Sequence, residues 1–338
     1  MTIRYLLTLL NSLVLLIWPQ PSYTEGFLTQ PCNLNPLAGE TNDASRLAQN
    51  LIFQGLTKYN DRGELEGDLA ESWEVQNEGL VYIVHLKKDV HWHDGQLFGA
   101  NDVLYTAANF TPMQDLIIDR LDEYTLRFTL PNKYSPFLDL LTVKIIPAHI
   151  KWEDLNRGQA VGTGFYKLLY VKKRRDQTES ITLGAATKEP KIKKIVFKFY
   201  TDEASLKTAA KLGEIDGFIG RNEWLWPSFK LIESPIKSRY YAIFFNNDNE
   251  AVKPSGVRKK LAMAVPTKEI IVQVFSGKGD EVNGPLDQTW AAETSEIKLT
   301  EEEEQDLKLP EKLVLTIPNS PEHQQTAAII QKAWKELG

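Results

Sequence analysis

The segment "KKIVFKFYTDEASLKTAAKLGEIDGFIG", residues 193–220, decides the fold class because its apolar pattern changes period twice. Apolar side chains alternate over 195–199, which predicts a strand with one buried face. Asp202 then opens a short helix that Gly213 closes, and residues 214–220 form a second apolar strand. A strand, a helix and a second strand at this spacing are a βαβ unit. The sequence therefore predicts an α/β fold in which helices cover a sheet.

Toward the amino terminus, the pattern indicates antiparallel strands mixed with helices. Residues 80–86 alternate between the two faces of a strand, and the short turn after them predicts a hairpin with a second strand at 90–93. Asn101 is the predicted N-cap of the helix that follows, from Asp102 to about Phe110. The other elements predicted here are a helix at 44–56 and a strand at 124–130 that Pro131 ends.

Toward the carboxyl end, strands and helices alternate again. Thr300 and Glu303 have the spacing of a capping box, so the acidic run at 301–304 is the solvated start of a helix and not a metal site. The last helix carries an apolar stripe after which another strand would normally follow, so we infer that the native polypeptide continues beyond Gly338. The predicted elements are strands at 240–245 and 312–317 and helices at 257–264, 267–275 and 321–337.

The composition is that of an acidic globular protein. Its 338 residues, 42% of them hydrophobic, suffice for a large core in two domains. The formal net charge of −6 offers no excess of cations to neutralise phosphates, so we expect no nucleic-acid partner. Cys32 is the only cysteine, which leaves neither an intrachain disulfide nor a thiolate metal site.

The first residues have the outline of an export signal. Arg4 gives a positive start, and residues 5–18 are almost entirely apolar. This run is shorter than the roughly 20 residues that span a bilayer, which favours a secretory signal over an uncleaved anchor. With Ser22-Tyr-Thr24 as the candidate cleavage triplet, residues 1–24 are assigned to a signal peptide or membrane anchor. We therefore expect the protein in the periplasm or on the outer face of the cytoplasmic membrane.

A histidine-rich turn is the clearest candidate for metal chemistry. His91 and His93 would share one face of a strand, and His85 in the preceding strand would lie opposite, which suits zinc. The alternative is a solvated hairpin face whose reverse carries Val90 and Trp92. No helical His-Glu-x-x-His motif accompanies these histidines, so we assign no metal ligand and no catalytic residue.

Taken in order, five segments resemble one family, the extracellular solute-binding proteins of family 5, which serve peptide/nickel-type ABC transporters. The first two carry a Gly-Leu turn, Leu-Ala-x-Ser-Trp, and an Asp-Gly turn before an Ala-x-Asp-Val helix. The segments are "LIFQGLTKYNDRGELEGDLAESWEV" (51–75), "YIVHLKKDVHWHDGQLFGANDVLYT" (82–106), "VGTGFYKL" (161–168), "KLGEIDGF" (211–218) and "VRKKLAMAV" (257–265).

The resemblance implies a two-lobed α/β protein with the periplasmic-binding-protein-like type II fold, built from mixed sheets and an inserted subdomain that contains a hairpin. Lobe I would be discontinuous, at 25–43 and 160–256, and the inserted subdomain would occupy 44–159. Lobe II, which would be incomplete, would cover 257–338. Such a protein closes on its ligand by hinge motion and makes no covalent bonds.

The resemblance also places candidate ligand neighbours on three loops. The stretch "TQPCNLNPL" (29–37) corresponds to the loop after the family's first strand. A Gly-Thr-Gly element lies beside the cleft, where glycines let the backbone approach a ligand. Phe165 replaces the proline usual after that element. The third loop contains Asn246, which follows the predicted strand at 240–245 and falls near the crossover between the lobes. For all of these residues, an ordinary loop at the end of a strand is the alternative. They are Cys32, Asn33, Leu34, Gly162, Thr163, Gly164, Phe165 and Asn246.

These expectations describe a non-enzymatic receptor of an ABC importer. We expect a monomer without a cofactor that captures oligopeptides in an interlobe cleft and delivers them to permease subunits in the membrane. Two alternatives stay open, a zinc-dependent hydrolase at His91 and His93 and a membrane-anchored sensory binding module. The charged groups with which family members hold peptide termini would follow Gly338, so a nickel complex or a sugar also stays open as the ligand.

Overall fold

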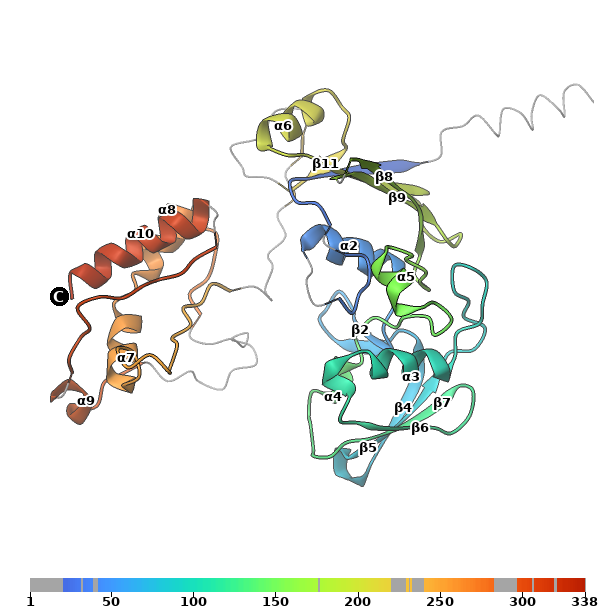
Figure 1. Cartoon of the computed structure of the whole chain (residues 1–338), viewed down its shortest axis with the longest axis horizontal. Coiled ribbons are helices and arrows are strands. Elements are labelled where there is room, and N and C mark those ends of the chain that lie inside the picture. Colours follow the sequence, from blue (N-terminus) through green and yellow to red (C-terminus); the bar gives the residue numbers. More distant parts are fainter. Residues whose placement is uncertain are drawn as a thin grey trace, which may run out of the picture. The chain divides into compact units, whose positions relative to one another are not determined.

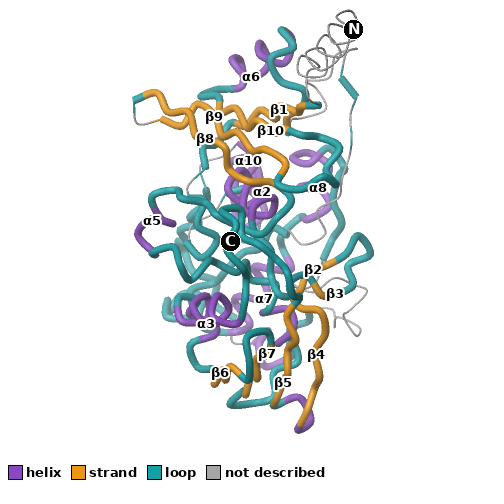
Figure 2. The backbone as a smooth tube through the Cα atoms, turned by 90° about the vertical axis from the view of Figure 1, so that its right-hand side faces the viewer, coloured by secondary structure: helices purple, strands orange, loops and turns teal. Residues whose placement is uncertain are grey.

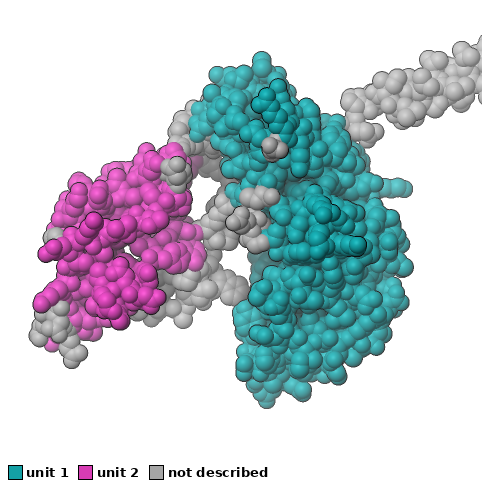
Figure 3. Space-filling view, viewed as in Figure 1, with its two compact units in different colours: residues 1–230 teal, residues 231–338 magenta. Residues whose placement is uncertain are grey.

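The computed structural model of the chain divides into two compact units, Met1–Lys230 (unit 1) and Leu231–Gly338 (unit 2), coloured separately in Figure 3. Each unit is described by itself. The lobe and subdomain boundaries expected at residues 44, 160 and 257 stay predictions. The structure describes residues 21–31, 33–38, 42–175, 177–219, 229–230, 232, 240–282, 297–305, 307–318 and 321–337.

Unit 1 contains a mixed five-stranded sheet in the order β11-β1-β10-β9-β8 (Figure 1). β1 lies parallel to β10 on one side and to β11 on the other, whereas β9 is antiparallel to both β10 and β8. The predicted βαβ unit is confirmed, with β1 inserted between its two strands. The strands are β1 (Ser22–Phe27), β8 (Tyr166–Arg174), β9 (Gln177–Ala185), β10 (Lys194–Phe199) and β11 (Gly217–Phe218).

Helices cover both faces of this sheet. α6 (Glu203–Lys211) begins at Asp202, whose side chain accepts a hydrogen bond from the Ser205 amide at 2.8 Å, as an N-cap does. Its apolar side packs near Tyr200 and Phe218. On the opposite face, α2 (Asp43–Ile52) buries an apolar stripe against the strands. Figures 1 and 2 show α2 between this sheet and the second sheet of unit 1.

The second sheet of unit 1 is antiparallel, in the order β4-β5-β7-β6, and α3 (Ala100–Ala108) shares its core. The predicted hairpin between 80–86 and 90–93 is wrong, because β5 pairs with β4 and β7. Residues 90–93 contribute one isolated bridge, His91 to Leu97. The remaining elements of this part are β2 (Thr57–Tyr59), β3 (Leu65–Gly67), β4 (Ala70–Gln76), β5 (Val81–Leu86), β6 (Ile117–Arg120), β7 (Thr125–Thr129), α4 (Phe137–Leu140), α5 (Trp152–Asn156) and 3-10 turns at Asn77–Gly79 and Thr111–Met113.

The start of α3 differs from the prediction. The N-cap is Gly99 and not Asn101, and the Asp102 side chain reaches back to accept the Gly99 amide at 3.0 Å. Asp102 is buried and also accepts from the Trp92 indole N–H at 3.3 Å and from the Ala148 amide at 2.8 Å. One carboxylate therefore ties together the start of α3, the histidine-rich turn and the segment after Ile146.

Among its described residues, unit 2 consists of helices and extended segments. The strands predicted at 240–245 and 312–317 are not formed there, because neither segment has a strand partner among the described residues. Val252, Val257 and Leu261 form a small core, on which Trp334 packs. The helices are α7 (Ser255–Met263), α8 (Thr267–Phe275), α9 (Glu301–Gln305) and α10 (Pro321–Lys335).

The predicted capping box at the start of α9 is confirmed. The Glu303 amide donates to the Thr300 hydroxyl at 3.2 Å, and the Thr300 amide donates to the Glu303 carboxylate at 3.0 Å. Lys259 and Ser255 also donate to this carboxylate, and the three hydrogen bonds lower the pKa of Glu303 to about 2. The acidic run is thus the start of a helix, bound to α7 through Glu303.

Large apolar side chains of unit 2 lie in solvent, which predicts dye binding. Phe244 is 88% exposed and Val314 is 82% exposed. Because exposed apolar surface binds hydrophobic dyes, we expect the native chain to enhance dye fluorescence, and the double variant Phe244→Ser, Val314→Ser to halve it, roughly. Leu212→Ser in unit 1, a single exposed side chain, is the matched control and should leave the signal unchanged. Equal fluorescence of the double variant and the wild type would contradict the prediction.

The expected export signal lies mostly outside the described residues, which begin at residue 21. Ser22, Tyr23 and Thr24 lie in β1 and pair with Lys194–Val196 of β10. Cleavage after Thr24 would remove these residues from the sheet. The boundary at residue 24 stays a prediction.

Candidate functional site

Helix α2 holds the first loop of the candidate site. The helix begins at Asn42, whose side chain accepts a hydrogen bond from the Ser45 amide at 2.9 Å. Within α2, Gln49 is buried, and its side-chain amide donates to the carbonyl oxygens of Asn33 and Asn35, both at 3.2 Å. A buried side-chain amide between two loop carbonyls fixes the loop on the helix.

The first loop is further ordered by its own asparagines. Asn35 is buried and donates through Nδ2 to Asn156 Oδ1 at 2.8 Å, while its Oδ1 accepts from the Leu37 amide at 3.0 Å. The Asn33 side chain accepts from the Asn35 amide at 2.7 Å. Leu34 is 6% exposed and belongs to the core under the five-stranded sheet, so its side chain serves packing. Cys32 lies outside the described residues.

The second loop, the Gly-Thr-Gly element, is pressed against the end of α2. The Gly164 amide donates to the Ile52 carbonyl oxygen at 2.8 Å. A Cβ atom on Gly162 would lie 1.8 Å from that same oxygen, and one on Gly164 would lie 2.5 Å from the Leu51 carbonyl oxygen. Both glycines are therefore required for the loop to approach the helix backbone. What the loop backbone approaches here is α2, within the same unit.

His93 binds the other side of this loop. Its backbone amide donates to the Gly162 carbonyl oxygen at 2.9 Å, its Nδ1 lies 3.3 Å from the Gly162 amide, and its Nε2 lies 2.8 Å from the Gly164 carbonyl oxygen. Burial lowers the pKa of His93, and the nearby Lys167 acts in the same direction. The Gly164 carbonyl and the Asp94 carboxylate oppose this lowering but do not cancel it.

Two side chains of the loop differ in their exposure. The Thr163 hydroxyl is buried and lacks a hydrogen-bond partner within the described part of the chain. Phe165 is 55% exposed. An unpaired buried hydroxyl is costly by about 1–3 kcal/mol, so a ligand that pairs with it gains that free energy. The loop thus offers the exposed Phe165 ring to a ligand, whereas the buried Thr163 hydroxyl can pair with a ligand only when the loop opens.

Asn246 belongs to unit 2 and forms a turn there. Its carbonyl oxygen accepts from the Asn249 amide, and its side chain accepts from the Asp248 amide, both at 3.0 Å. Asn246 is exposed. The structure brings the candidate residues of the first and second loops together on α2, and it describes Asn246 with unit 2 alone.

The histidines of the turn and of β5 contact different neighbours and do not converge. His91 is exposed and its Nδ1 lies 3.0 Å from the Asp89 carbonyl oxygen, whereas His93 is partly buried on the Gly-Thr-Gly element. His85, on β5, lies beside Thr125 and Glu74. The interpretation that His91 and His93 share a wet face is therefore wrong. The described residues contain no group of three or more His, Cys, Asp or Glu side chains that could hold a metal ion.

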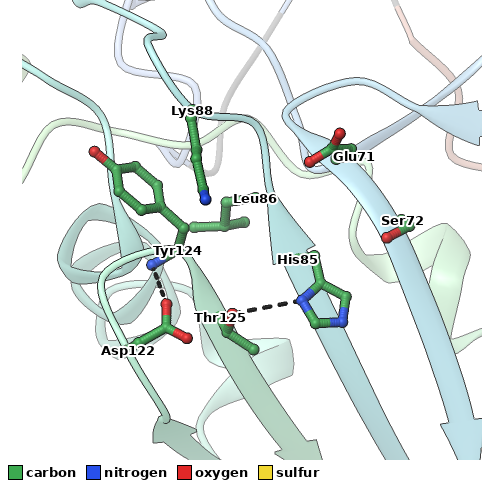
Figure 4. Close-up of a pocket in the computed structure, with 8 residues that line it drawn as sticks. All are labelled: Glu71, Ser72, His85, Leu86, Lys88, Asp122, Tyr124 and Thr125. Atoms are coloured by element: carbon green, nitrogen blue, oxygen red, sulfur yellow. Dashed lines mark hydrogen bonds between the residues drawn. The ribbon is translucent and has the colours of Figure 1, made fainter.

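A polar pocket of about 460 Å³ lies elsewhere, on the four-stranded sheet (Figure 4). The His85 ring faces Thr125 with Nδ1 and Oγ1 3.4 Å apart, and the Tyr124 amide donates to Asp122 at 2.7 Å, which holds the pKa of that carboxyl below its usual value. Lys88 carries its charge into the same pocket. The lining residues are Glu71, Ser72, His85, Leu86, Lys88, Asp122, Tyr124 and Thr125.

The residues that hold the candidate loops include Gln49, Asn35 and Asn156, which carry no functional signal in the sequence, and His93, whose pattern suggested zinc and not a loop contact. Local sequence indicates the two loops only through the asparagines of "CNLNP" and through Gly162 and Gly164, which precede Phe165. Their partners lie far away in sequence, 121 residues for Asn35 and Asn156 and 71 for His93 and Gly164. No local pattern reports contacts over such separations.

Comparison with known proteins identifies a family model, described as bacterial extracellular solute-binding proteins, family 5 Middle, that matches residues 64–338. The oligopeptide-binding protein AppA of Bacillus subtilis is 25% identical over 288 residues, which cover 75% of this chain and 52% of that protein. The chain spans about half the length of the curated relatives that it matches.

Solved structures show the same fold. NikZ from Campylobacter jejuni, in complex with Ni(L-His), matches with a TM-score of 0.76 at 24% identity and covers 95% of this chain and 72% of its own. AppA from Bacillus subtilis, in complex with a nonapeptide, matches with a TM-score of 0.73 at 22% identity. This match covers 95% of this chain and 74% of the AppA chain. The predicted class, α/β of the periplasmic-binding-protein-like type II, is confirmed.

None of the helices that the structure describes has both the length and the apolar character that crossing a membrane requires.

Proposed function

The chain belongs to the bacterial extracellular solute-binding proteins of family 5, and from this premise we propose that it captures oligopeptides outside the cytoplasm for an ABC importer. The family consists of binding proteins and not of enzymes, so no catalytic residue is assigned. The observation that carries the proposal is the family match over residues 64–338. The zinc-hydrolase alternative has no comparable support.

Several relatives are named for peptides of different lengths, and one of them supports oligopeptides as the solute class. The AppA protein, which resembles this chain in sequence and in fold, is an oligopeptide-binding protein crystallised with a nonapeptide. The loop at 162–165 suits such a ligand, because peptide side chains pack on the exposed Phe165 ring and a peptide backbone would pair with the Thr163 hydroxyl once the loop opens. A nickel complex is the competing solute, since the NikZ structure contains Ni(L-His).

The wider proposal follows from the same membership. The protein would act as a monomer in the periplasm or on the outer face of the cytoplasmic membrane and would deliver its solute to the permease subunits. The interlobe cleft that the resemblance implies, with Asn33, Gly162 and Asn246 near the ligand, is part of this proposal. It includes no cofactor.

Calorimetric titration of the full chain with a mixture of nonapeptides tests the proposal. We expect saturable binding and a rise in thermal stability, because a ligand at about 100 times its Kd stabilises the folded state by about 2.7 kcal/mol. Ni(L-His) is titrated in parallel. Heat and stabilisation with the nickel complex and none with peptides would reject the peptide proposal, and no response to either solute would reject solute binding by this chain.

The Thr163 hydroxyl provides a sharper test within the same titration. Thr163→Val should weaken peptide binding about tenfold, because the ligand loses a hydrogen bond in a buried place. The same change should leave the free energy of unfolding unchanged or slightly higher, since it removes an unpaired buried hydroxyl. Thr163→Ser keeps the hydroxyl and is the matched control with wild-type affinity. A variant with Val that binds peptides as tightly as wild type would exclude this hydroxyl from the site.

A further inference from the structure

The turn around His93 is the strongest feature that solute binding leaves unexplained. Its two neighbours are fixed on either side. Trp92 is 2% exposed and donates its indole N–H to Asp102 at 3.3 Å, and Asp94 accepts from His149 Nε2 at 2.7 Å. The backbone of the turn is closed by the Trp92 amide on the Gln96 carbonyl oxygen at 2.8 Å. Contacts of the turn itself therefore fix the position of the His93 ring, independently of its contacts with the Gly-Thr-Gly element.

The hydrogen bonds of the ring determine its protonation state. The Gly162 amide can only donate, so the Nδ1 atom that faces it at 3.3 Å must be the acceptor and carry no proton. The Gly164 carbonyl oxygen can only accept, so the Nε2 atom at 2.8 Å must carry the proton. The arrangement is satisfied by one neutral tautomer of His93. A second proton on Nδ1 would put two donors face to face.

We propose that neutral His93 is a positioning residue for the Gly162–Gly164 loop, and that protonation of His93 releases this loop and weakens solute binding. The loop is held by the Ile52 carbonyl on one side and, on the other, by the His93 ring together with the His93 backbone amide, which donates to the Gly162 carbonyl at 2.9 Å. Protonation keeps the Nε2 contact to the Gly164 carbonyl but puts a second donor, on Nδ1, against the Gly162 amide, and this repulsion pushes the Gly162 end of the loop away from the ring. The inference rests on the proposed function, because it takes the loop as part of the solute site.

The direction with pH follows from the groups around the ring. Burial and the Lys167 charge disfavour the protonated ring, the Gly164 carbonyl and the Asp94 carboxylate favour it, and the pKa of His93 is lowered on balance. The Asp94 carboxylate is itself paired with His149. Because the folded-state pKa lies below the unfolded value of about 6.5, the contribution of His93 is complete above that value. It is lost as the pH falls through the folded pKa.

Hydrogen exchange of the Gly162 and Gly164 amides, measured by NMR on the full chain without ligand, tests the positioning role. Between about pH 7.5 and about pH 5 we expect their protection factors to fall tenfold or more, roughly in step with titration of the His93 ring. His93→Gln should have the same protection at both pH values, because an amide does not titrate there. His91→Gln, two residues away and exposed, is the matched control and should keep the wild-type pH dependence.

Peptide affinity over the same pH range is the second readout. The wild type and His91→Gln should bind more weakly at low pH, and His93→Gln should bind with an affinity that does not change with pH. Protection that stays constant in the wild type, or falls equally in His93→Gln, would overturn the proposal. If His93→Gln folds poorly, a His93 titration in the wild type that does not coincide with the loss of Gly162 protection overturns it. Failure to bind any peptide, with the exchange result intact, would reject the proposed function and leave the loop anchor standing.

Discussion

Replacing Asp102 by alanine should lower the free energy of unfolding of unit 1 by about 4 kcal/mol. The carboxylate is 6% exposed and accepts hydrogen bonds from Trp92, Gly99 and Ala148. Alanine leaves all three donors in a buried place without a partner, and each such donor costs about 1–3 kcal/mol. Urea unfolding followed by circular dichroism measures the change.

Two matched variants locate the origin of that loss. Asp102→Asn keeps one acceptor oxygen of similar shape and should lose about half as much. Asp115→Ala removes an exposed carboxylate and should lie within about 0.5 kcal/mol of the wild type. An Asp102→Ala chain as stable as Asp115→Ala would show that the three donors find other partners, and it would remove Asp102 as the connection between α3 and the turn at Trp92.

Gly162→Ala should be the most damaging small change in the candidate site, at about 3 kcal/mol of unfolding free energy together with the loss of measurable peptide binding. The new Cβ would lie 1.8 Å from the Ile52 carbonyl oxygen, which is backbone at the end of α2 and cannot rotate away. The loop must then leave the helix, and the bonds from His93 are broken with it. Urea unfolding and peptide titration measure the two effects.

Gly213→Ala is the control for this substitution. Gly213 has a positive φ of 71°, and a Cβ added there would have no atom within 4 Å, so alanine costs only the strain of the left-handed backbone conformation, about 1–2 kcal/mol. Because Gly213 lies far from the loop in sequence, Gly213→Ala should keep its peptide affinity, and this affinity is the measurement that distinguishes the two variants. If the two alanine variants lose equal stability and both bind peptides, close packing of the Gly-Thr-Gly element on α2 is not required for function.

The βαβ unit could be predicted from sequence because one continuous segment contains the whole signal. The alternation over 195–199, the Asp202 cap and the closing Gly213 are all local, and β10, α6 and β11 form where these signals lie. What the pattern did not contain is β1 between the two strands. Its pairing with Lys194–Phe199 joins segments that are more than 160 residues apart.

The partners of β5 could not be predicted for a related reason. Most side chains of β4, Ala70–Gln76, are exposed, so the strand shows little of the alternation that marks a buried face. The segment 90–93 is nearer to β5 in sequence and alternates more clearly, so the local pattern favours it as the partner. Its failure as a strand also explains the histidines, because residues two apart share a face only in an extended strand. His91 and His93 therefore serve different neighbours.

In unit 2, two segments have the sequence pattern of a strand but do not form one. Residues 240–245 and 312–317 have apolar runs typical of strands, yet a strand exists only when another backbone pairs with it. No such partner occurs within the described residues of unit 2, and Phe244 and Val314 lie in solvent. The helices of this unit needed no distant partner and were predicted to within a few residues.

The position of β1 has a consequence for the order in which the molecule is made. Ser22–Phe27 is synthesised early, but its neighbours in the sheet are Lys194–Phe199 and Gly217–Phe218. Because translation adds roughly 5–20 residues per second, β1 is without its strand partners for on the order of ten to thirty seconds, until they leave the ribosome. Such non-local pairing also folds slowly once it is possible. The five-stranded sheet therefore cannot be completed until most of unit 1 has been synthesised, because β1 lies between β10 and β11.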